Sequence, residues 1–169
     1  MIKGTYKPKF QKVYDILHNQ IKSDYELGAA VSVELNGEEV INLWGGYTSE
    51  SKEKLWEENT IVNVWSVTKA VTGVCIAKLI SDEKLDINER VSYYWPEYGV
   101  NGKENTKVID FLSHRAGMFG FQEGYPDANW NDWNIYIDAL QSQKPFREPG
   151  SSQGYHAVTF AWLVGELIK

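Results

Sequence analysis

Three features of the sequence predict an α+β fold. A segment near the N-terminus carries apolar residues at helical spacing, and two alternating segments around Asn36-Gly37 have the pattern of a β-hairpin. The rest of the chain is mostly helical in pattern. The 169 residues lie within the range of one domain and can bury a sizeable core. We therefore expect a helix and a small sheet, followed by a helical region.

The N-terminal segment predicts one helix and two antiparallel strands. Apolar residues recur on one helical face at Phe10, Val13, Tyr14, Leu17 and Ile21. Positions 29–35 alternate between apolar and small or polar residues, and a second strand is expected over 39–44, ended by Gly45-Gly46. Asn36-Gly37 is a strong signal for a two-residue hairpin turn because both positions tolerate a positive φ. No further strand is evident from the pattern.

Four helices are expected after the hairpin. They are placed at 66–80, 107–113, 134–142 and 155–168, with Thr106 capping the second helix, Gly117 stopping it, and a turn at Pro149-Gly150 before the last. The last helix stays apolar to its final residues, and an isolated hairpin is only marginally stable. We therefore interpret residues 1–169 as the N-terminal portion of a single, larger domain.

The composition excludes several classes of function. A formal net charge of −6 is unsuited to binding nucleic acid or an anionic membrane surface. The N-terminus has no signal-peptide core and no apolar run is long enough to cross a membrane, so a cytoplasmic location is expected.

Cys75 is the only cysteine, which rules out an internal disulfide. Because it lies within an apolar helix, it is expected to pack. No residues have metal-ligand or phosphate-loop spacing, so no cofactor is expected.

The tetrad Ser66–Lys69 is the most informative motif. A serine and a lysine three residues apart on a helix share one face, with about 5–6 Å between their Cβ atoms. At that separation an amine can hold or remove the hydroxyl proton, which activates a weak nucleophile. The first turn of a helix also favours developing negative charge. The tetrad predicts the nucleophile and proton partner of a serine acyl-transferring enzyme.

The same spacing occurs at three other places in the chain. They are Ser49/Lys52, Ser51/Lys54 and Ser81/Lys84. The first two lie in a charged, solvated run, and the third lies where a helix ends. Only Ser66/Lys69 opens an apolar helix, where partial desolvation makes a neutral amine accessible. Context therefore selects this pair among the four. A capping serine with a surface lysine stays the alternative interpretation of the same spacing.

Six segments, taken in order, resemble one known superfamily. They are Asn42–Gly46, Ser66–Lys69, Leu85–Asn88, Phe111–Gly117, Glu148–Gly150 and Tyr155–Ala157. Together they resemble the serine β-lactamase and penicillin-binding-protein superfamily, in the class C β-lactamase-like branch that includes bacterial carboxylesterases. The resemblance implies a β-lactamase/transpeptidase-like α+β fold, of which the chain carries the N-terminal helix, the hairpin and the region with the Ser-x-x-Lys motif.

The resemblance also implies a third catalytic residue, Tyr155, at the position of the family's Tyr-x-Asn tyrosine. The unperturbed pKa of tyrosine is about 10, so positive charge from Lys69 would be needed for it to act as a base at neutral pH. Ser66 would then be the nucleophile, and Lys69 the proton acceptor and electrostatic partner. Tyr155 would be general base and later general acid, and the backbone N–H of Ser66 would be one oxyanion donor.

Two departures from the family pattern affect the expected function. Ala157 stands where the family has asparagine, and alanine cannot recognise the amide of a β-lactam or peptide, which favours ester substrates. The family's later Lys-Thr-Gly, His-Thr-Gly or Trp-Gly-Gly strand does not follow Tyr155, and Trp44-Gly45-Gly46 precedes the nucleophile and cannot replace it. The missing strand would supply the second oxyanion donor, whose loss typically costs roughly 100- to 1,000-fold in rate.

Three functions are therefore compatible with the sequence. The preferred one is a serine hydrolase that cleaves small carboxylic esters through an acyl-enzyme and needs a complementing C-terminal polypeptide. The second is a β-lactamase or D-alanyl-D-alanine peptidase, and the third is a catalytically incomplete half-domain that acts in assembly or binding. The expected partner is a small ester or β-lactam-like molecule, without nucleic acid or membrane.

Several further residues are candidates for parts of the site. His114 lies in a segment resembling a structural turn of the family, so we expect a structural role rather than a general base. His156 should point away from Tyr155 and act at most indirectly. Five aromatic residues could line an acyl pocket, although packing is the more common role of such side chains. They are Phe119, Phe121, Tyr125, Trp130 and Trp133.

Overall fold

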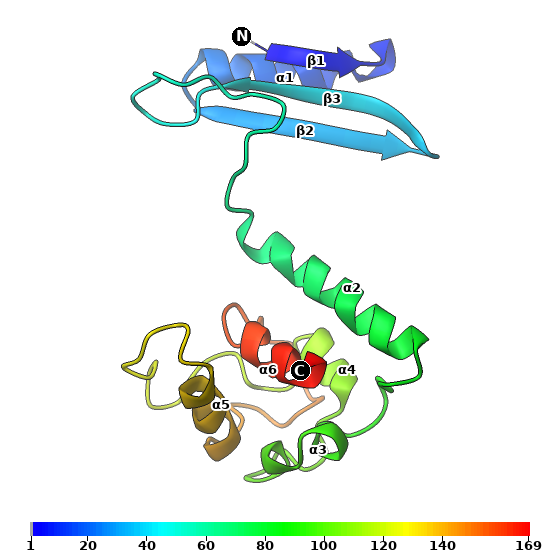
Figure 1. Cartoon of the computed structure of the whole chain (residues 1–169), viewed down its shortest axis with the longest axis vertical. Coiled ribbons are helices and arrows are strands. Elements are labelled where there is room, and N and C mark those ends of the chain that lie inside the picture. Colours follow the sequence, from blue (N-terminus) through cyan, green and yellow to red (C-terminus); the bar gives the residue numbers. More distant parts are fainter. Residues whose placement is uncertain (1) are drawn as a thin grey trace. The chain divides into compact units, whose positions relative to one another are not determined.

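The computed structural model describes residues 2–169, which form two compact units. The first ends at Asn63 and the second is Val64–Lys169 (Figure 1). The first contains the sheet, and the second is helical. No helix of residues 2–169 is long and apolar enough to cross a membrane.

The first unit is a three-stranded antiparallel sheet with one helix. Its elements are β1 (Ile2–Tyr6), α1 (Gln11–Lys22), β2 (Gly28–Leu35) and β3 (Glu38–Gly46), and the strand order is β1-β3-β2. The predicted helix and hairpin are confirmed. Asn36 and Gly37 have φ of 54° and 79°, which are the positive values that a tight hairpin turn requires.

Strand β1 was not predicted from the sequence. It pairs along β3 from Ile2 opposite Gly45 to Tyr6 opposite Ile41. Its middle residues are exposed, so it has no apolar alternation to detect. Gly4 has a φ of 102°, and a Cβ there would lie 1.9 Å from the Asn42 carbonyl oxygen. The strand therefore depends on close backbone contact rather than on side-chain burial.

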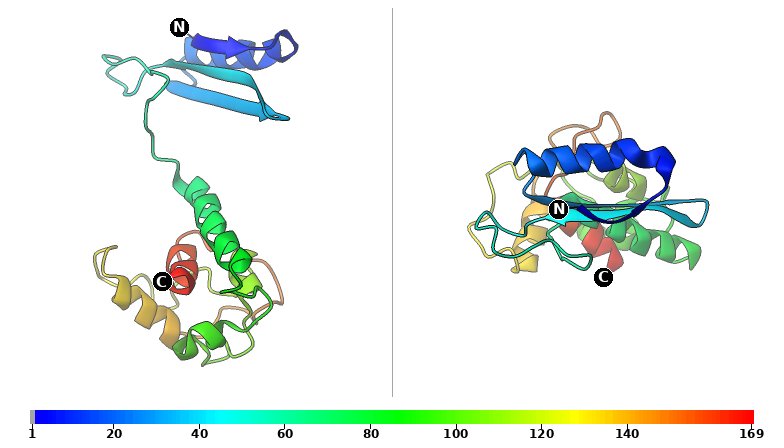
Figure 2. Two further views of the ribbon diagram at one scale, coloured as in Figure 1. Left: turned by 45° about the vertical axis from the view of Figure 1, so that its right-hand side comes forward. Right: turned by 90° about the horizontal axis from the view of Figure 1, so that it is seen from above.

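Helix α1 packs against one face of the sheet (Figure 2). The fully buried residues of this core are Leu17, Val40, Ile41 and Leu43. They combine one position from the apolar face of α1 with three from β3, the central strand. Burial of this face accounts for the helical spacing seen in the sequence.

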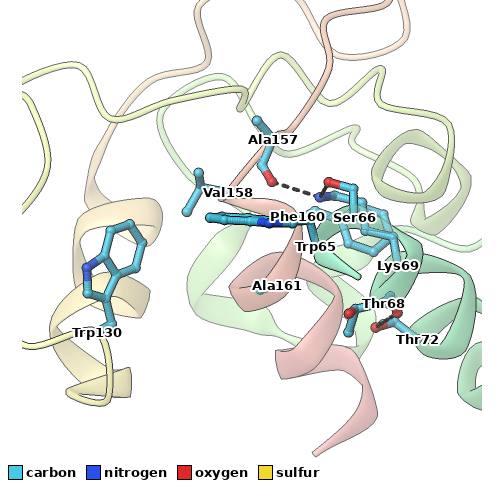
Figure 3. A pocket seen from close by; sticks show the side chains of 10 residues that line it. All are labelled: Trp65, Ser66, Thr68, Lys69, Thr72, Trp130, Ala157, Val158, Phe160 and Ala161. Atoms are coloured by element: carbon cyan, nitrogen blue, oxygen red, sulfur yellow. Dashed lines mark hydrogen bonds between the residues drawn. The ribbon is translucent and has the colours of Figure 1, made fainter. Parts of the chain in front are cut away.

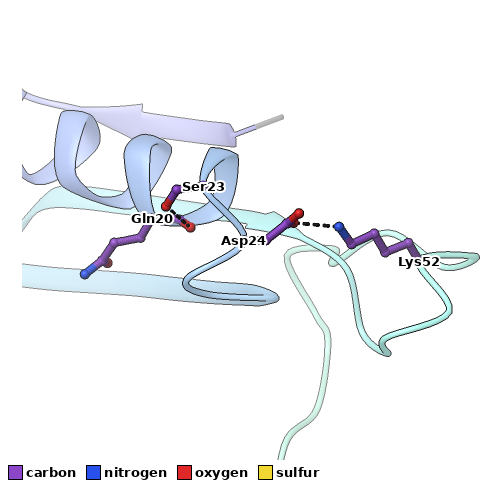
Figure 4. A network of polar contacts seen from close by, with 4 residues as sticks. All are labelled: Gln20, Ser23, Asp24 and Lys52. Carbon is purple, nitrogen blue, oxygen red and sulfur yellow. Dashed lines mark hydrogen bonds and ion pairs between the residues drawn. The ribbon is translucent and has the colours of Figure 1, made fainter.

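An ion pair joins two loops of the first unit (Figure 4). Lys52 Nζ lies 2.5 Å from Asp24 Oδ1, so the loop after β3 is tied to the turn that follows α1. The hydrogen bond to Asp24 raises the pKa of Lys52. Ser23 Oγ donates to the Gln20 carbonyl at 3.2 Å and closes the end of α1. Lys52 is thus engaged in a structural contact.

The second unit is a group of helices built around α6. Its helices are α2 (Thr68–Ser81), α3 (Val91–Tyr94), α4 (Val108–Leu112), α5 (Trp133–Ser142) and α6 (Phe160–Ile168). Helix α6 contacts α2, α4 and α5, and it buries Phe160, Trp162, Leu163 and Val164. In Figure 1 its red ribbon lies among the other helices. The segment that ends the chain is therefore the centre of this core.

The structure corrects four details of the predicted elements. Ser66 lies in a 3₁₀ turn, Trp65–Val67, just before α2. Lys107, not Thr106, is at the N-cap of α4, where its N–H donates to the Asp110 carboxylate. Helix α4 ends at Leu112, before Gly117. The last helix begins at Phe160, so Tyr155 lies in the irregular segment before it. Helix α3 was not predicted.

Helix α2 is largely exposed despite its apolar sequence. Ile76 is its one fully buried residue, whereas Val71 and Val74 are 62% and 68% exposed. Cys75 is exposed as well, which corrects the expectation that it packs. Val71, Val74 and Cys75 are three and four residues apart, so they share one face of the helix. This group is called the α2 surface below.

A buried lysine holds the C-terminal end of α5. Lys103 is 1% exposed, and its Nζ donates to the carbonyl oxygens of Gln141, at 2.9 Å, and of Gln143. The ammonium also lies 5.2 Å from the centre of the Tyr98 ring. These carbonyls are at a helix end, where cations are favoured. Burial nevertheless lowers the pKa of Lys103 to about 8.

Candidate active site

Ser66 is presented by a strained turn. Trp65, the residue before it, has a φ of 46°, which is unusual for a bulky side chain. Such conformations are costly and often mark functional sites. The turn leads directly into α2, so Ser66 lies two residues before Thr68, the first residue of that helix.

Lys69 lies in the first turn of α2 with its ammonium beside Ser66. Its Nζ is 3.1 Å from Ser66 Oγ and donates to the carbonyl oxygen of Ala157 at 2.7 Å (Figure 3). The carbonyl comes from the segment before α6, and Ser66 comes from the turn before α2. Lys69 therefore links the two parts of the chain that form the site.

Tyr155 completes the group of three predicted residues. Its Oη is 2.8 Å from Ser66 Oγ, and the centre of its ring is 5.0 Å from Lys69 Nζ. The hydrogen bond with Ser66 and the contact with Lys69 lower the pKa of the Tyr155 phenol. Both effects favour the phenolate, because a hydroxyl can donate to it and a cation neutralises it. The structure thus brings Ser66, Lys69 and Tyr155 together.

The protonation state decides what this group can do. When Lys69 and Tyr155 both carry their protons, both donate to Ser66 Oγ, and the serine proton has no base among them. When one of the two loses a proton, it becomes an acceptor for the Ser66 hydroxyl. The arrangement can therefore deprotonate Ser66 as the oxygen attacks, provided that the pair holds one proton fewer.

The competing Ser-x-x-Lys pair at Ser49/Lys52 is engaged elsewhere. Lys52 is bound to Asp24, and Ser49 Oγ lies 3.0 Å from Ser51 Oγ. This serine and this lysine therefore have other partners, whereas Ser66 and Lys69 contact each other directly.

Two histidines lie next to Tyr155. His156 is fully buried, and its Nδ1 is 3.1 Å from Nδ1 of His114. The His114 ring meets the Tyr155 ring edge to face, with centroids 4.8 Å apart. Burial and the neighbouring His114 lower the pKa of His156 to about 4, and burial followed by the charge of Lys69 lowers that of His114. The His156 ring bonds to His114 and accepts the Met118 N–H.

An apolar pocket of about 410 Å³ opens beside Ser66 and Lys69. Helices α2 and α6 form two of its sides, and Figure 3 shows Trp130 across from Phe160. The other lining residues are Trp65, Thr68, Thr72, Ala157, Val158 and Ala161. A cavity of this size and lining suits an apolar group of a small molecule.

Trp130 is one of the five aromatic residues proposed for this pocket, and it is the one that lines it. Its ring stacks on Trp162, with centroids 5.6 Å apart, and on Tyr136 at 5.8 Å. The other four residues pack elsewhere. Phe119 stacks on Phe146, Phe121 is buried, Tyr125 packs on Phe121 and Trp130, and the Trp133 indole donates to Glu166.

Sequence reasoning missed one functional contact of the main chain. The Ala157 carbonyl that holds Lys69 has no side-chain signature, because any residue supplies it. Sequence reasoning also placed Tyr155 in a helix, whereas the irregular segment before α6 is what brings Tyr155 Oη and this carbonyl to the same serine. Only the path of the backbone reveals this contact.

This chain is similar to known proteins in both sequence and fold. Residues 16–169 match the Beta-lactamase family model. The esterase/beta-lactamase LipL of Mycobacterium tuberculosis is 30% identical over 166 residues, which cover 98% of this chain and 38% of LipL. A family VIII carboxylesterase superposes with a TM-score of 0.90 at 36% identity, over 99% of this chain and 46% of its own. A penicillin-binding protein homologue from Caulobacter crescentus has a TM-score of 0.93 at 32% identity, over 99% and 45%.

The fold is thus the α+β fold of the β-lactamase/transpeptidase class, and it is incomplete. The chain belongs to the Beta-lactamase family, whose members among these relatives include esterase-type hydrolases. It spans less than half the length of the relatives that it matches.

Proposed function

We propose that this chain carries the nucleophile half of a serine hydrolase that cleaves small carboxylic esters through an acyl-enzyme. The observation that carries the proposal is the position of Ser66 Oγ, within 3.1 Å of Lys69 Nζ and 2.8 Å of Tyr155 Oη. Membership of a family with esterases supports the reaction class.

In the acylation step Ser66 is the nucleophile, Tyr155 is first the base and then the acid, and Lys69 supplies the positive charge beside Tyr155. Tyr155, as phenolate beside Lys69, takes the proton of the Ser66 hydroxyl while Oγ bonds to the ester carbonyl carbon. The oxyanion accepts a hydrogen bond from the Ser66 backbone N–H. Collapse of this intermediate breaks the bond to the alkoxy oxygen, and Tyr155 returns the proton to that leaving group. The product is an acyl-Ser66 ester and a free alcohol.

Deacylation repeats the sequence with water. Tyr155 takes a proton from the water as its oxygen bonds to the acyl carbon. When the second intermediate collapses, Tyr155 returns that proton to Ser66 Oγ, and the carboxylic acid leaves. Lys69 keeps its charge beside the phenolate throughout, which stabilises the basic form of Tyr155.

The pocket supports an ester with an apolar acyl group. Its walls are mostly carbon, and the side chain of Ala157 can neither donate nor accept a hydrogen bond to an amide. The alternative is a β-lactamase or D-alanyl-D-alanine peptidase. It is supported by two of the similar proteins, which are named as an esterase/beta-lactamase and as a penicillin-binding protein homologue. Parallel assays with a p-nitrophenyl ester and a chromogenic cephalosporin separate the two.

We also propose that turnover requires a complementing C-terminal polypeptide that carries the remaining strands and a Lys-Thr-Gly-like motif. The apolar α2 surface supports this, since Val71 and Val74 are more than half exposed within the second unit and such a segment would bury them. The chain covers 46% and 45% of two of the similar structures, which agrees with this proposal. In the alternative, the chain is a half-domain that acts only in assembly or binding.

The test is ester hydrolysis by the chain with and without a polypeptide that supplies those strands, in wild type and in Ser66→Ala. Ser49→Ala is the matched control, because Ser49 belongs to the competing pair. We expect turnover that depends on the added polypeptide and on Ser66. Turnover retained by Ser66→Ala contradicts the nucleophile, and binding without turnover favours the half-domain.

A further inference from the structure

His114 holds the backbone on both sides of Tyr155. The Gly154 N–H donates to the His114 carbonyl at 2.8 Å, and the His156 N–H donates to His114 Nδ1 at 3.2 Å. The rings of His114 and Tyr155 also meet edge to face. The residues before and after Tyr155 are thus bonded to one histidine, while the ring between them packs against that histidine.

His156 anchors the same segment to the core. Its ring lies in a fully buried position, and Nε2 accepts the Met118 N–H at 3.1 Å. The Met118 carbonyl accepts the Thr159 hydroxyl at 2.6 Å, so both backbone groups of Met118 are bonded to the segment that carries Tyr155. His156 and Thr159 together attach this segment to the chain that follows α4.

These contacts select one tautomer for each ring. His156 accepts at Nε2, so its single proton is on Nδ1, from which it donates to His114 Nδ1. His114 accepts at Nδ1, so its proton is on Nε2. Both rings are neutral in this arrangement. A further proton must enter at His114 Nδ1 or at His156 Nε2, and each of these nitrogens faces a donor.

We propose that the neutral His114–His156 pair is the positioning device for Tyr155, and that gaining a proton releases Tyr155 from Ser66. The proposal rests on the proposed function for the role of Tyr155, and on the hydrogen bonds above for the mechanism. The pair touches no substrate, so it acts through the placement of Tyr155 Oη.

The surroundings of the pair oppose a positive charge. The titratable groups that face it are Lys69 from α2 and Tyr155, while Phe160 of α6 contributes an apolar ring 5.3 Å from that of His114. Lys69 repels an imidazolium, and a buried ring loses hydration when it is charged. The lowered pKa values of both histidines agree with this environment.

The first experiment measures the pair without any reaction. Histidine ¹⁵N spectra of the full chain, with His18 as the only other histidine, report the tautomer of each ring. We expect the Nδ1–H form for His156 and the Nε2–H form for His114 at pH 7. On acidification, both histidine rings should lose these tautomers, and the Tyr155 ring signals should change over the same pH range. Other tautomers, or a Tyr155 signal indifferent to the titration, overturn the proposal.

The second experiment compares two variants of His114 by the rate of fluorophosphonate labelling at Ser66. His114→Asn keeps an acceptor near Nδ1 and suits the residue's φ of 60°, whereas His114→Leu removes the acceptor. A misplaced catalytic group can cost about 100-fold, so we expect a loss approaching that in His114→Leu and most of the rate restored in His114→Asn. The acidic limb of the rate profile should change in both variants.

The two proposals fail in different ways. Equal labelling rates and pH profiles in His114→Leu and wild type, with both shown to be folded, contradict the positioning role alone. Absence of labelling in folded wild type, both alone and with the complementing polypeptide, contradicts the proposed function. In that case the histidine tautomers still test the positioning role, and so does the pKa of Tyr155 in wild type compared with His114→Leu. A Tyr155 pKa that returns to the ordinary value of tyrosine in His114→Leu supports the role. An unchanged Tyr155 pKa contradicts it.

Discussion

Tyr155 Oη lies 2.8 Å from Ser66 Oγ, although the two residues are 89 positions apart in the chain. The contact depends on α6, which packs against α2 and carries the segment before it to the start of that helix. The packing of α6 against α2 therefore places the Tyr155 hydroxyl beside the oxygen of the candidate nucleophile.

Replacing Tyr155 with phenylalanine tests the proton-transfer role. The change removes one oxygen and leaves the ring packed against His114, so the free energy of unfolding should change by no more than about 1.5 kcal/mol. Removal of a general base typically costs about 100- to 10,000-fold, and we expect a loss in that range for acylation of Ser66. Tyr93→Phe, at an exposed tyrosine, is the matched control. An unchanged rate in Tyr155→Phe would exclude the tyrosine from the mechanism.

Trp130→Ala should change substrate preference. The ring forms one wall of the pocket and is held by stacking on Trp162 and Tyr136. Its removal should lower reactivity toward esters with bulky apolar acyl groups more than toward acetyl esters. Comparison of labelling or hydrolysis rates across such a series measures this. Tyr125→Ala, which removes a neighbour of Trp130 that is not part of the pocket wall, is the control. A uniform loss across the series would argue against an acyl pocket.

Stability should fall as the pH drops from about 6.5 to about 4. The pKa of His156 is about 4 in the folded chain against 6.5 for an ordinary histidine, so the unfolded chain binds more protons in this interval. Stability therefore rises with pH there, by on the order of 3 kcal/mol from this group, and levels off above 6.5. Urea unfolding at pH 4.5 and pH 7, in wild type and His156→Gln, checks this. An equal acid loss in the variant would assign the effect to other groups.

Lys103→Met should destabilise the helical unit. The change leaves the carbonyls of Gln141 and Gln143 without their buried donor, at a cost of about 1–3 kcal/mol for an unsatisfied group. The pKa of Lys103 is lowered to about 8, so between pH 8 and 10.5 the unfolded chain binds the extra proton. Wild-type stability should thus gain with rising pH in that window relative to the variant. Thermal unfolding of both proteins at pH 7 and pH 9.5 measures the difference, and parallel pH profiles would contradict it.

The sequence predicted well where periodicity or motif order carries the information. The spacing of Phe10, Val13 and Leu17 located α1, and Asn36-Gly37 located the hairpin. The order of Ser66–Lys69 and Tyr155–Ala157 indicated the family, which the comparisons confirm. It also singled out three residues that the structure brings within hydrogen-bonding or ring-contact distance of one another.

Contacts made by the backbone could not be predicted from the sequence. Strand β1 depends on the close approach of Gly4 to Asn42, and Lys69 is held by the carbonyl of Ala157, neither of which has a side-chain pattern. The exposure of Cys75 could not be inferred either. An apolar helix sequence predicts burial but does not indicate which other element covers each of its faces. His114 also reached its position through a positive φ just after α4, where a glycine would be the usual signal.

The most direct measurement is the intact mass of the chain after reaction with a fluorophosphonate, alone and with a complementing C-terminal polypeptide. We expect a single adduct, mapped to Ser66 by peptide analysis, lost in Ser66→Ala and retained in Ser49→Ala. A faster reaction with the added polypeptide would show that the site is shared. No adduct on folded protein under either condition, or an adduct on another serine, would contradict the assignment of Ser66 as an activated nucleophile.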